Sequence, residues 1–389
     1  MNQTPTHSRL LLPGLFLLGM LMRMPITVIP SIVDPIAKSF RVEVTSLGIL
    51  TTIPLLCFGC LSLIIATIAQ KLGNELTIEL AIVGLTVGAF LRIPSFTSLI
   101  IGSILVGIGI TGINVLLPAI VADKYPSHTG SITGMYSIAT TLFSAIGAYW
   151  VTPISNHSSW QIGLIIVGLI TLFAVIFWLP NLHYNHLQPN TTEIFSGNVK
   201  IWQRRNAWLL LVYFGCQSFV FYSCVAWLPS IAMSAGLNNN RASLIAGLFQ
   251  LFSIPFAYFI PMFAAKMIDQ RPLILFAGCM CIIGSLMMLA NIKSMAYFTL
   301  VAFFLGAGTS TSFVLGMTLF TIKAKTPAIA RQLSGMVQSG GYLIAALGPV
   351  SVGSLNHLTS NWVLGIALLV IVALIYTFCG SLVGSKRYI

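Results

Sequence analysis

Long apolar segments and short polar breaks alternate along the chain from residue 10 onward. An α-helix rises 1.5 Å per residue, so about 20 apolar residues cross the hydrocarbon core of a bilayer. Charged residues, prolines and polar clusters separate twelve such segments, and we predict a helix in each. The predicted spans are 10–33, 45–69, 76–93, 97–122, 131–152, 160–180, 207–233, 241–264, 273–291, 295–322, 331–354 and 362–384. The pattern therefore predicts an all-α membrane protein with twelve transmembrane helices.

The most polar stretch of the chain, residues 181–206, follows the sixth predicted helix. It separates two groups of six helices. We therefore predict an N-terminal six-helix half over 1–180, a linker over 181–206 and a C-terminal six-helix half over 207–389. The other connections are short, as is usual between neighbouring helices.

The two halves carry similar short sequences at a nearly constant spacing. Residues 29–32 (IPSI) and 228–231 (LPSI) are 199 positions apart, and Gly107 and Gly306 share that spacing. In the fifth and eleventh predicted helices the spacing becomes 201. This agreement indicates a duplicated six-helix unit. Two units of the same orientation are related by an axis along the membrane normal, so we expect a binding site at their interface near the midplane.

The composition agrees with a lipid environment. Hydrophobic residues make up 57% of the chain, charged residues only 7%, and the mean hydropathy is +0.95. A soluble domain carries roughly 25% charged residues. The net charge of +12 comes from basic residues scattered between apolar segments. A nucleic-acid-binding face needs them clustered, so we expect no nucleic-acid partner. We expect the protein to lie in a lipid bilayer.

The basic residues also predict the orientation. With twelve helices both termini lie on one side, and thirteen of the nineteen lysines and arginines fall on that side. These are Arg9, Lys71, Lys124, Lys200, Arg204, Arg205, Lys266, Arg271, Lys323, Lys325, Arg331, Lys386 and Arg387. The other side has Lys38, Arg41, Arg92, Arg241 and Lys293. Positive loops stay in the cytoplasm, so we expect both termini and the linker to be cytoplasmic.

Arg23 lies near the middle of the first predicted helix, where an arginine costs about 2.5–3.5 kcal/mol on insertion scales. Pro25 and Pro30 follow it and predict a bend with exposed carbonyl groups. Two roles remain open for Arg23: it packs the halves together through helix carbonyls, or it binds an anionic or polar substrate. We favour substrate binding, because the acids of the sequence lie in loops or at helix ends: Asp34, Glu43, Glu75, Glu79, Asp123, Glu193 and Asp269.

Other polar residues are expected at similar depth and are candidates to complete the site. With Arg23 the predicted substrate-binding set is Thr52, Asn114, Gln217, Tyr222, Gln250, Gln338 and Tyr342, with Thr51 beside them. An interhelical hydrogen bond is the alternative role for each. At the 199-residue spacing Arg23 corresponds to Tyr222.

The cysteines and histidines predict no metal site, cofactor or catalytic centre. All seven cysteines lie inside apolar segments, where free cysteine behaves as a small hydrophobe, and the C-x-x-C of Cys57 and Cys60 has no histidine or acid nearby. The six histidines lie in loops or near helix ends. Since an enzyme would need a nucleophile, base or metal cluster, we expect none.

Six plus six helices with a long middle loop resemble the major facilitator superfamily. Residues 66–75 (ATIAQKLGNE) resemble that superfamily's loop motif G-x-L-A-D-R-x-G-R-R, with Gln70 in place of the acid and Asn74 in place of a base. The resemblance implies a transporter that works by alternating access, usually as a monomer.

More narrowly, the chain resembles the cyanate and nitroimidazole transporters of that superfamily. The resembling pieces are Arg23 with Pro30, 48–54 (GILTTIP), 114–118 (NVLLP), Gln217 with Ser218, Phe221 with Tyr222, and 226–229 (AWLP). The family implies uptake or exchange of small anionic or polar molecules through a bacterial inner membrane.

A multidrug exporter of the same fold is the alternative function. Exporters of cationic drugs generally need a negative charge in the cavity, and Arg23 has the opposite sign. Entry of an anion into a negative cell interior costs roughly 2.3 kcal/mol per charge per 100 mV. Proton coupling, exchange for another anion and passage of a neutral molecule all remain open.

Overall fold

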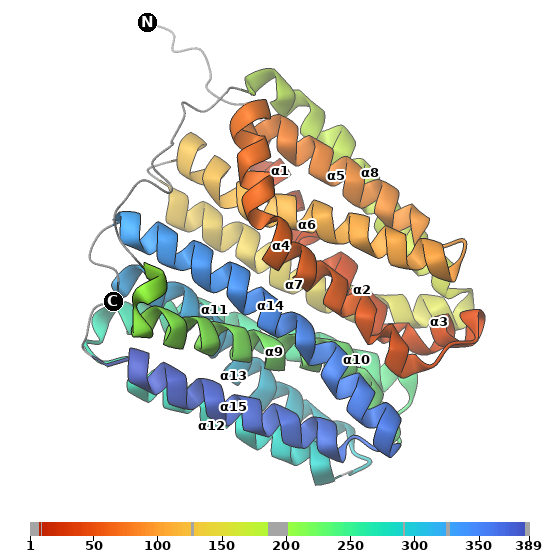
Figure 1. The fold of residues 1–389 in the computed structure, drawn as a ribbon. Coiled ribbons are helices and arrows are strands. Elements are labelled where there is room, and N and C mark those ends of the chain that lie inside the picture. The colour runs from red at the N-terminus through yellow and green to blue at the C-terminus, as the bar shows by residue number, and fades with distance from the viewer. Residues whose placement is uncertain are drawn as a thin grey trace, which may run out of the picture. The chain divides into compact units, whose positions relative to one another are not determined.

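The structure of the protein is a computed structural model, and it describes residues 8, 10–125, 128–185, 201–290, 292–323 and 327–385. Within those ranges every regular element is a helix, mostly α-helical with short 3₁₀ segments (Figure 1). The prediction of an all-α protein is confirmed.

The chain forms two compact units. The first contains Met1–Arg41 and Cys60–Thr191, and the second contains Val42–Gly59 and Thr192–Ile389. Helix α4, Ile49–Leu72, contributes its first part to the second unit and its remainder to the first. The predicted division into 1–180, 181–206 and 207–389 stays a prediction, and residues 186–200 of the linker lie outside the described residues.

The remaining helices of each unit follow in chain order. The first unit has α1 (Leu11–Leu21), α2 (Met24–Ser31), α3 (Val33–Phe40), α5 (Asn74–Leu91), α6 (Phe96–Lys124), α7 (Thr129–His157), α8 (Trp160–Trp178) and η2 (Leu179–Tyr184). The second has η1 (Val44–Gly48), η4 (Ile201–Gln203), α9 (Arg205–Ser234), α10 (Asn239–Leu251), α11 (Ser253–Lys266), α12 (Arg271–Met287), η5 (Met288–Ala290), α13 (Met295–Ile322), α14 (Pro327–Thr359) and α15 (Val363–Val383).

The observed helices cover the twelve predicted spans. Eleven segments of the described residues are long and apolar enough to cross a membrane, and α14 covers the remaining predicted span, 331–354. Two spans are interrupted: 10–33 is divided into α1 and α2, and 241–264 into α10 and α11. The interruption of the first span positions Arg23.

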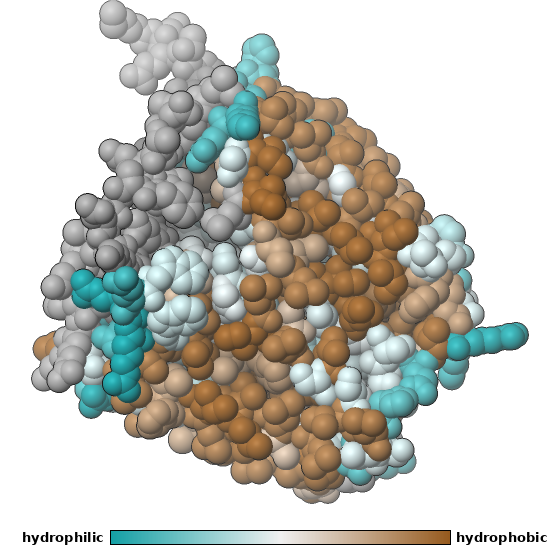
Figure 2. Space-filling model, viewed as in Figure 1, coloured by the Kyte–Doolittle hydropathy of each residue, from teal (hydrophilic) through white to brown (hydrophobic). Residues whose placement is uncertain are grey.

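Each unit exposes apolar side chains that suit contact with lipid. On α8 they recur every three or four residues and so share one face of the helix. They are Ile162, Ile165, Leu169, Leu172, Phe173 and Ile176. Figure 2 shows apolar residues along the length of the helices and hydrophilic residues gathered near helix ends. This distribution is expected where water is present only at the ends.

Glycines allow the closest helix contacts within the first unit. A Cβ atom added to Gly102 on α6 would lie 2.5 Å from the carbonyl oxygen of Gly88 on α5. A Cβ atom on Gly109 would lie 2.5 Å from the carbonyl oxygen of Ala81. The glycine run of α6 therefore packs two backbones together, as small residues commonly do between membrane helices.

Candidate functional site

Arg23 lies at a break in the first predicted helix. Helix α1 ends at Leu21, α2 begins at Met24, and the backbone of Arg23 between them is not helical, with φ −137°. Pro25 is the second residue of α2 and explains the break: it has no N–H, and its ring clashes with the carbonyl group four residues before it. The same proline is well tolerated in the first turn of a new helix.

The break concentrates positive charge at one point of the first unit. The N-terminus of a helix carries a partial positive charge, and Arg23 is the N-cap residue of α2. The Arg23 side chain is partly buried. A full charge and a helix N-terminus at one position form a site that favours an anion.

Hydroxyl groups of α7 donate hydrogen bonds to the backbone on both sides of the break. Thr140 Oγ1 donates to the Gly19 carbonyl at 2.8 Å, and Thr152 Oγ1 donates to the Ser31 carbonyl at 3.0 Å. These two residues are twelve positions apart, more than three turns of α7, so their hydroxyl groups contact α1 and α2 at well-separated points. The hydroxyl of Thr27 donates to the Ser144 carbonyl at 3.2 Å. Helix α7 therefore holds α1 and α2 in the broken arrangement.

Arg92 supports the break from its other side. Its Nη1 donates to the Pro25 carbonyl at 2.8 Å and its Nε to the Ser103 hydroxyl at 3.1 Å, and the residue is only 1% exposed. Its Nη2 has no hydrogen-bond partner among the described residues. From the sequence Arg92 was assigned only to the outer loops as an orientation signal. No sequence pattern separates it from an exposed arginine at a helix end.

Asn114 is the second candidate in the first unit. It lies within α6, is partly buried, and donates from Nδ2 to the carbonyl of Ile110 in the same helix at 3.0 Å. This contact occupies one of its two N–H groups. Its role in substrate binding stays a prediction.

Two glutamines of the second unit have buried amide oxygens without a partner. Gln217 on α9 is 1% exposed and Gln250 on α10 is 2% exposed. The Oε1 atom of each accepts no hydrogen bond from the described residues, although Gln217 Nε2 donates to the Ser218 hydroxyl at 2.6 Å. A buried acceptor without a donor is destabilising. Each is therefore suited to accept a hydrogen bond from a ligand or a water molecule.

Tyr222 lies in an aromatic layer beside these amides. Its ring meets that of Phe221 edge-on at 5.0 Å, and Phe221 in turn lies 5.7 Å from Phe249, the neighbour of Gln250. The residue is 6% exposed. These ring contacts pack α9 against α10.

Of the remaining candidates, Thr52 and Tyr342 make contacts between helices of the second unit, whereas Gln338 makes a contact within α14. Thr52 Oγ1 donates to the Ala346 carbonyl at 3.1 Å, which is the interhelical hydrogen bond expected as its alternative role. The Tyr342 ring meets Phe58 at 5.2 Å and Phe214 at 5.6 Å. Gln338 donates to the Ser334 hydroxyl within α14. Their part in substrate binding stays a prediction, and Thr51 beside them is buried at 2% exposure.

The loop motif between α4 and α5 forms an ion pair through its last residue. Glu75 Oε1 lies 3.3 Å from Lys124 Nζ, and both side chains are nearly buried, at 3% and 7% exposure. Trp178 Nε1 donates to the Glu75 backbone carbonyl at 3.1 Å. Glu75 thus supplies an acid next to this loop, where Gln70 occupies the usual acidic position of the motif.

Comparison with known proteins identifies relatives along nearly the whole chain. The 2-nitroimidazole transporter of Escherichia coli K12 is 30% identical over 376 residues, which cover 95% of each chain. The uncharacterized transporter YycB of Bacillus subtilis is 31% identical, covering 97% of this chain and 94% of that protein. The cyanate transport protein CynX of E. coli is 25% identical over 90% of this chain and 91% of its own. These matches confirm the resemblance found in the sequence.

A solved structure supports the same fold. The D-xylose–proton symporter superposes with a TM-score of 0.76 at 14% identity, covering 96% of both chains. The family profile described as Major Facilitator Superfamily matches residues 13–349. The chain belongs to the Major Facilitator Superfamily and is a membrane transporter, not an enzyme.

Proposed function

We propose that this protein transports a small anionic or polar solute across the bacterial inner membrane by alternating access. The substrate class is that of its relatives, which are named for 2-nitroimidazole and cyanate. Both are compact molecules that accept hydrogen bonds, and a guanidinium can bind such groups through two parallel N–H donors. We further propose a monomer with both termini in the cytoplasm, as the distribution of basic residues favours.

The observation that carries this proposal is the position of Arg23 at the N-terminus of α2. The cation and the helix dipole act at the same point, and broken helices in transporters commonly direct such N-termini toward anionic groups of the substrate. The hydrogen bonds from α7 and Arg92 keep this arrangement in place without the substrate. A site held in this way loses less free energy when the solute binds.

The second unit supplies the acceptors in this proposal. The buried amide oxygens of Gln217 and Gln250 would accept hydrogen bonds from N–H groups of the solute, and Tyr222 would offer a flat ring to a heteroaromatic solute. Asn114, Thr52, Gln338 and Tyr342 complete the proposed substrate-binding set.

Transport by the purified protein in liposomes tests the role of Arg23. We expect Arg23→Gln to abolish uptake of cyanate and 2-nitroimidazole, and Arg23→Lys to restore only part of it, because lysine keeps the charge without the planar pair of donors. Arg241→Gln is the matched control, since Arg241 is an exposed arginine at the start of α10. Uptake by Arg23→Gln at the rate of the control would contradict the proposed site.

A further inference from the structure

A cavity of about 530 Å³ lies at the end of the second unit where α9 and α12 begin and α15 ends. Its walls include Arg205 and Asn206 at the start of α9, Asp269 and Arg271 at the start of α12, and Ser385 after α15. The volume falls within the range of about 300–1,000 Å³ that is common for small-molecule sites. None of these residues belongs to the substrate site proposed above.

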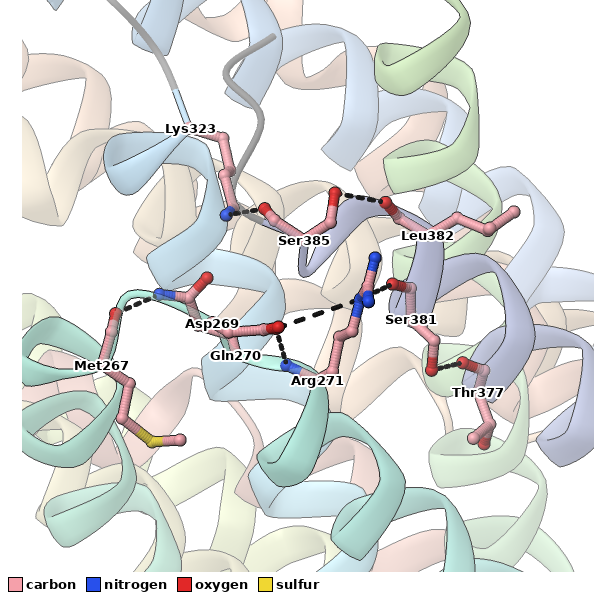
Figure 3. A network of polar contacts seen from close by, with 9 residues as sticks. All are labelled: Met267, Asp269, Gln270, Arg271, Lys323, Thr377, Ser381, Leu382 and Ser385. Carbon is pink, nitrogen blue, oxygen red and sulfur yellow. Dashed lines mark hydrogen bonds and ion pairs between the residues drawn. The ribbon is translucent and has the colours of Figure 1, made fainter.

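The cavity contains arginine donors that form no hydrogen bond with the part of the chain that the structure describes. Arg271 Nε donates to the Ser381 carbonyl at 3.1 Å and lies 4.0 Å from Asp269 Oδ1 (Figure 3). Its terminal nitrogens, and the whole guanidinium of Arg205, make no hydrogen bond to another described residue. Asp269 already accepts one hydrogen bond at the start of α12, because its Oδ1 accepts from the Arg271 backbone N–H at 3.0 Å.

A buried lysine adds positive charge beside this cavity. Lys323 is only 3% exposed and donates from Nζ to the carbonyl of Ser385, which lines the cavity (Figure 3). Burial lowers the pKa of Lys323, the nearby Arg271 lowers it further, and Asp269 partly opposes both. An anion in the cavity would relieve this destabilisation of the charged lysine.

The repeat shows that the first unit neutralises the corresponding lysine. Lys124 and Lys323 are 199 positions apart, each at the end of the helix that carries the repeated glycines. Lys124 is paired with Glu75 at 3.3 Å, but the position 199 residues after Glu75 is Ile274, which is fully buried. The second unit therefore keeps the lysine but has no carboxylate at the position that corresponds to Glu75.

The surroundings of the cavity place it at the depth of lipid headgroups. Two of the segments able to cross a membrane begin at Arg205 and at Arg271. Trp202 and Trp208 beside them are 64% and 46% exposed, and their rings meet at 5.8 Å. Exposed tryptophans are enriched at the membrane–water interface. In the orientation proposed above, this interface is the cytoplasmic one.

We propose that this cavity binds a phosphate-bearing anion, either the headgroup phosphate of an anionic phospholipid or free inorganic phosphate. Arginine forks match phosphate oxygens, and the N-termini of α9 and α12 place the positive ends of two helix dipoles at the cavity. Basic pockets between membrane helices on the cytoplasmic side are known to bind lipid phosphates. The headgroup depth favours the phospholipid as the source.

Thermal unfolding of the delipidated full-length protein tests the proposal. Phosphatidylglycerol is titrated in mixed micelles, phosphatidylcholine serves as the zwitterionic comparison, and inorganic phosphate is titrated separately. We expect phosphatidylglycerol to raise the unfolding temperature in a saturable manner and phosphatidylcholine to leave it unchanged. Saturable stabilisation by inorganic phosphate, changed in the same way by the variants described below, would support the site and identify free phosphate as the ligand.

Three variants distinguish binding of the anion in the cavity from its general attraction to positive surface charge. Arg205→Gln, at an exposed position, is expected to weaken apparent binding about tenfold through loss of a charged donor. Asp269→Asn is expected to tighten it about threefold, because the amide oxygen can still accept from the Arg271 backbone N–H while the repelling charge is removed. Lys266→Gln is the control, since Lys266 is exposed at the end of α11 and does not line the cavity.

The proposal is overturned if neither phosphatidylglycerol nor phosphate raises the unfolding temperature. It is also overturned if Arg205→Gln binds as tightly as the unmodified protein, or if Lys266→Gln weakens binding as much as Arg205→Gln does. Unchanged or weaker binding by Asp269→Asn would likewise count against it. None of these readouts depends on transport, so they remain informative if the proposed transport function is wrong.

Discussion

The first helices of the two repeats, α1–α2 and α9, differ at one informative point. Residues 29–32 and 228–231 correspond, and both contain a proline, yet α9 runs unbroken through Pro229 from Arg205 to Ser234. The break at Arg23 instead accompanies Pro25, whose counterpart 199 residues later is Cys224. The first repeat thus has Pro25 about one and a half turns before Pro30, whereas α9 has only Pro229. We attribute the division into α1 and α2, with Arg23 between them, to this additional proline.

The helices packed against them differ in a complementary way. At the 201-residue spacing, the α7 residues Thr140 and Thr152 correspond to Gly341 and Gly353 of α14. The hydroxyl groups of α7 donate to the backbone of the broken helix, whereas the α14 glycines bring that helix against α9: a Cβ on Gly341 would lie 2.6 Å from Phe214. The broken α1–α2 segment thus receives hydrogen bonds from α7, whereas the continuous α9 packs closely against glycines of α14.

Introducing the missing proline into α9 tests this comparison most strongly. We expect Cys224→Pro to lower the free energy of unfolding by about 3 kcal/mol or more, because it removes a helix hydrogen bond and clashes with the preceding turn, and α14 has glycines where α7 has the two threonines. Chemical denaturation in detergent measures the change, and Cys224→Ala controls for loss of the thiol. A Cys224→Pro protein as stable as the alanine variant would show that the break does not depend on partners.

Removing the support of Arg92 should have the next largest effect. Arg92→Leu leaves the Pro25 carbonyl and the Ser103 hydroxyl without their donor, which we expect to cost about 2 kcal/mol of unfolding free energy. Binding of small anions should also weaken, because the backbone beside Arg23 loses an anchor. The exposed Arg241→Leu variant serves as the control, and equal stability of the two variants would exclude an anchoring role.

Removing the proline of the first repeat should affect transport more than stability. Pro25→Ala allows α1 and α2 to join, which would move the Arg23 side chain away from the N-terminus of a helix. We expect uptake in liposomes to fall at least about tenfold, since small displacements of a positioned group have effects of this size. The unfolding temperature should stay the same or rise. Normal uptake by this variant would show that transport does not require the break between α1 and α2.

The smallest expected effect concerns the hydroxyl groups of α7. Thr140→Val and Thr152→Val should each cost about 0.6 kcal/mol, the average for hydrogen bonds between membrane helices. Thr141→Val is the matched control, because its hydroxyl bonds only to Ser137 in its own helix. A loss in the control as large as in the other two would indicate a general effect of the substitution.

The sequence predicted the features that depend on local pattern. Apolar length located the twelve helical spans, and Pro25 beside Arg23 marked the bend, whereas the duplicated six-helix unit stays a prediction. It missed features that depend on tertiary contacts. Arg92 and Lys323 resemble ordinary basic residues at helix ends, and only packing shows that each is buried. The pairing of Glu75 with Lys124 likewise joins residues far apart in the chain, which no local pattern encodes.

Helix α4 is shared between the two units. It is one rod whose first part, through Gly59, packs within the second unit and whose remainder packs within the first. Thr52 fastens it to α14, and the ring of Trp227 abuts Gly48 just before it. Any displacement of this first part must bend α4 near Pro54 or Gly59 or break its hydrogen bond to α14. The hydroxyl of Thr52 is therefore a brake on movement of α4 within the second unit.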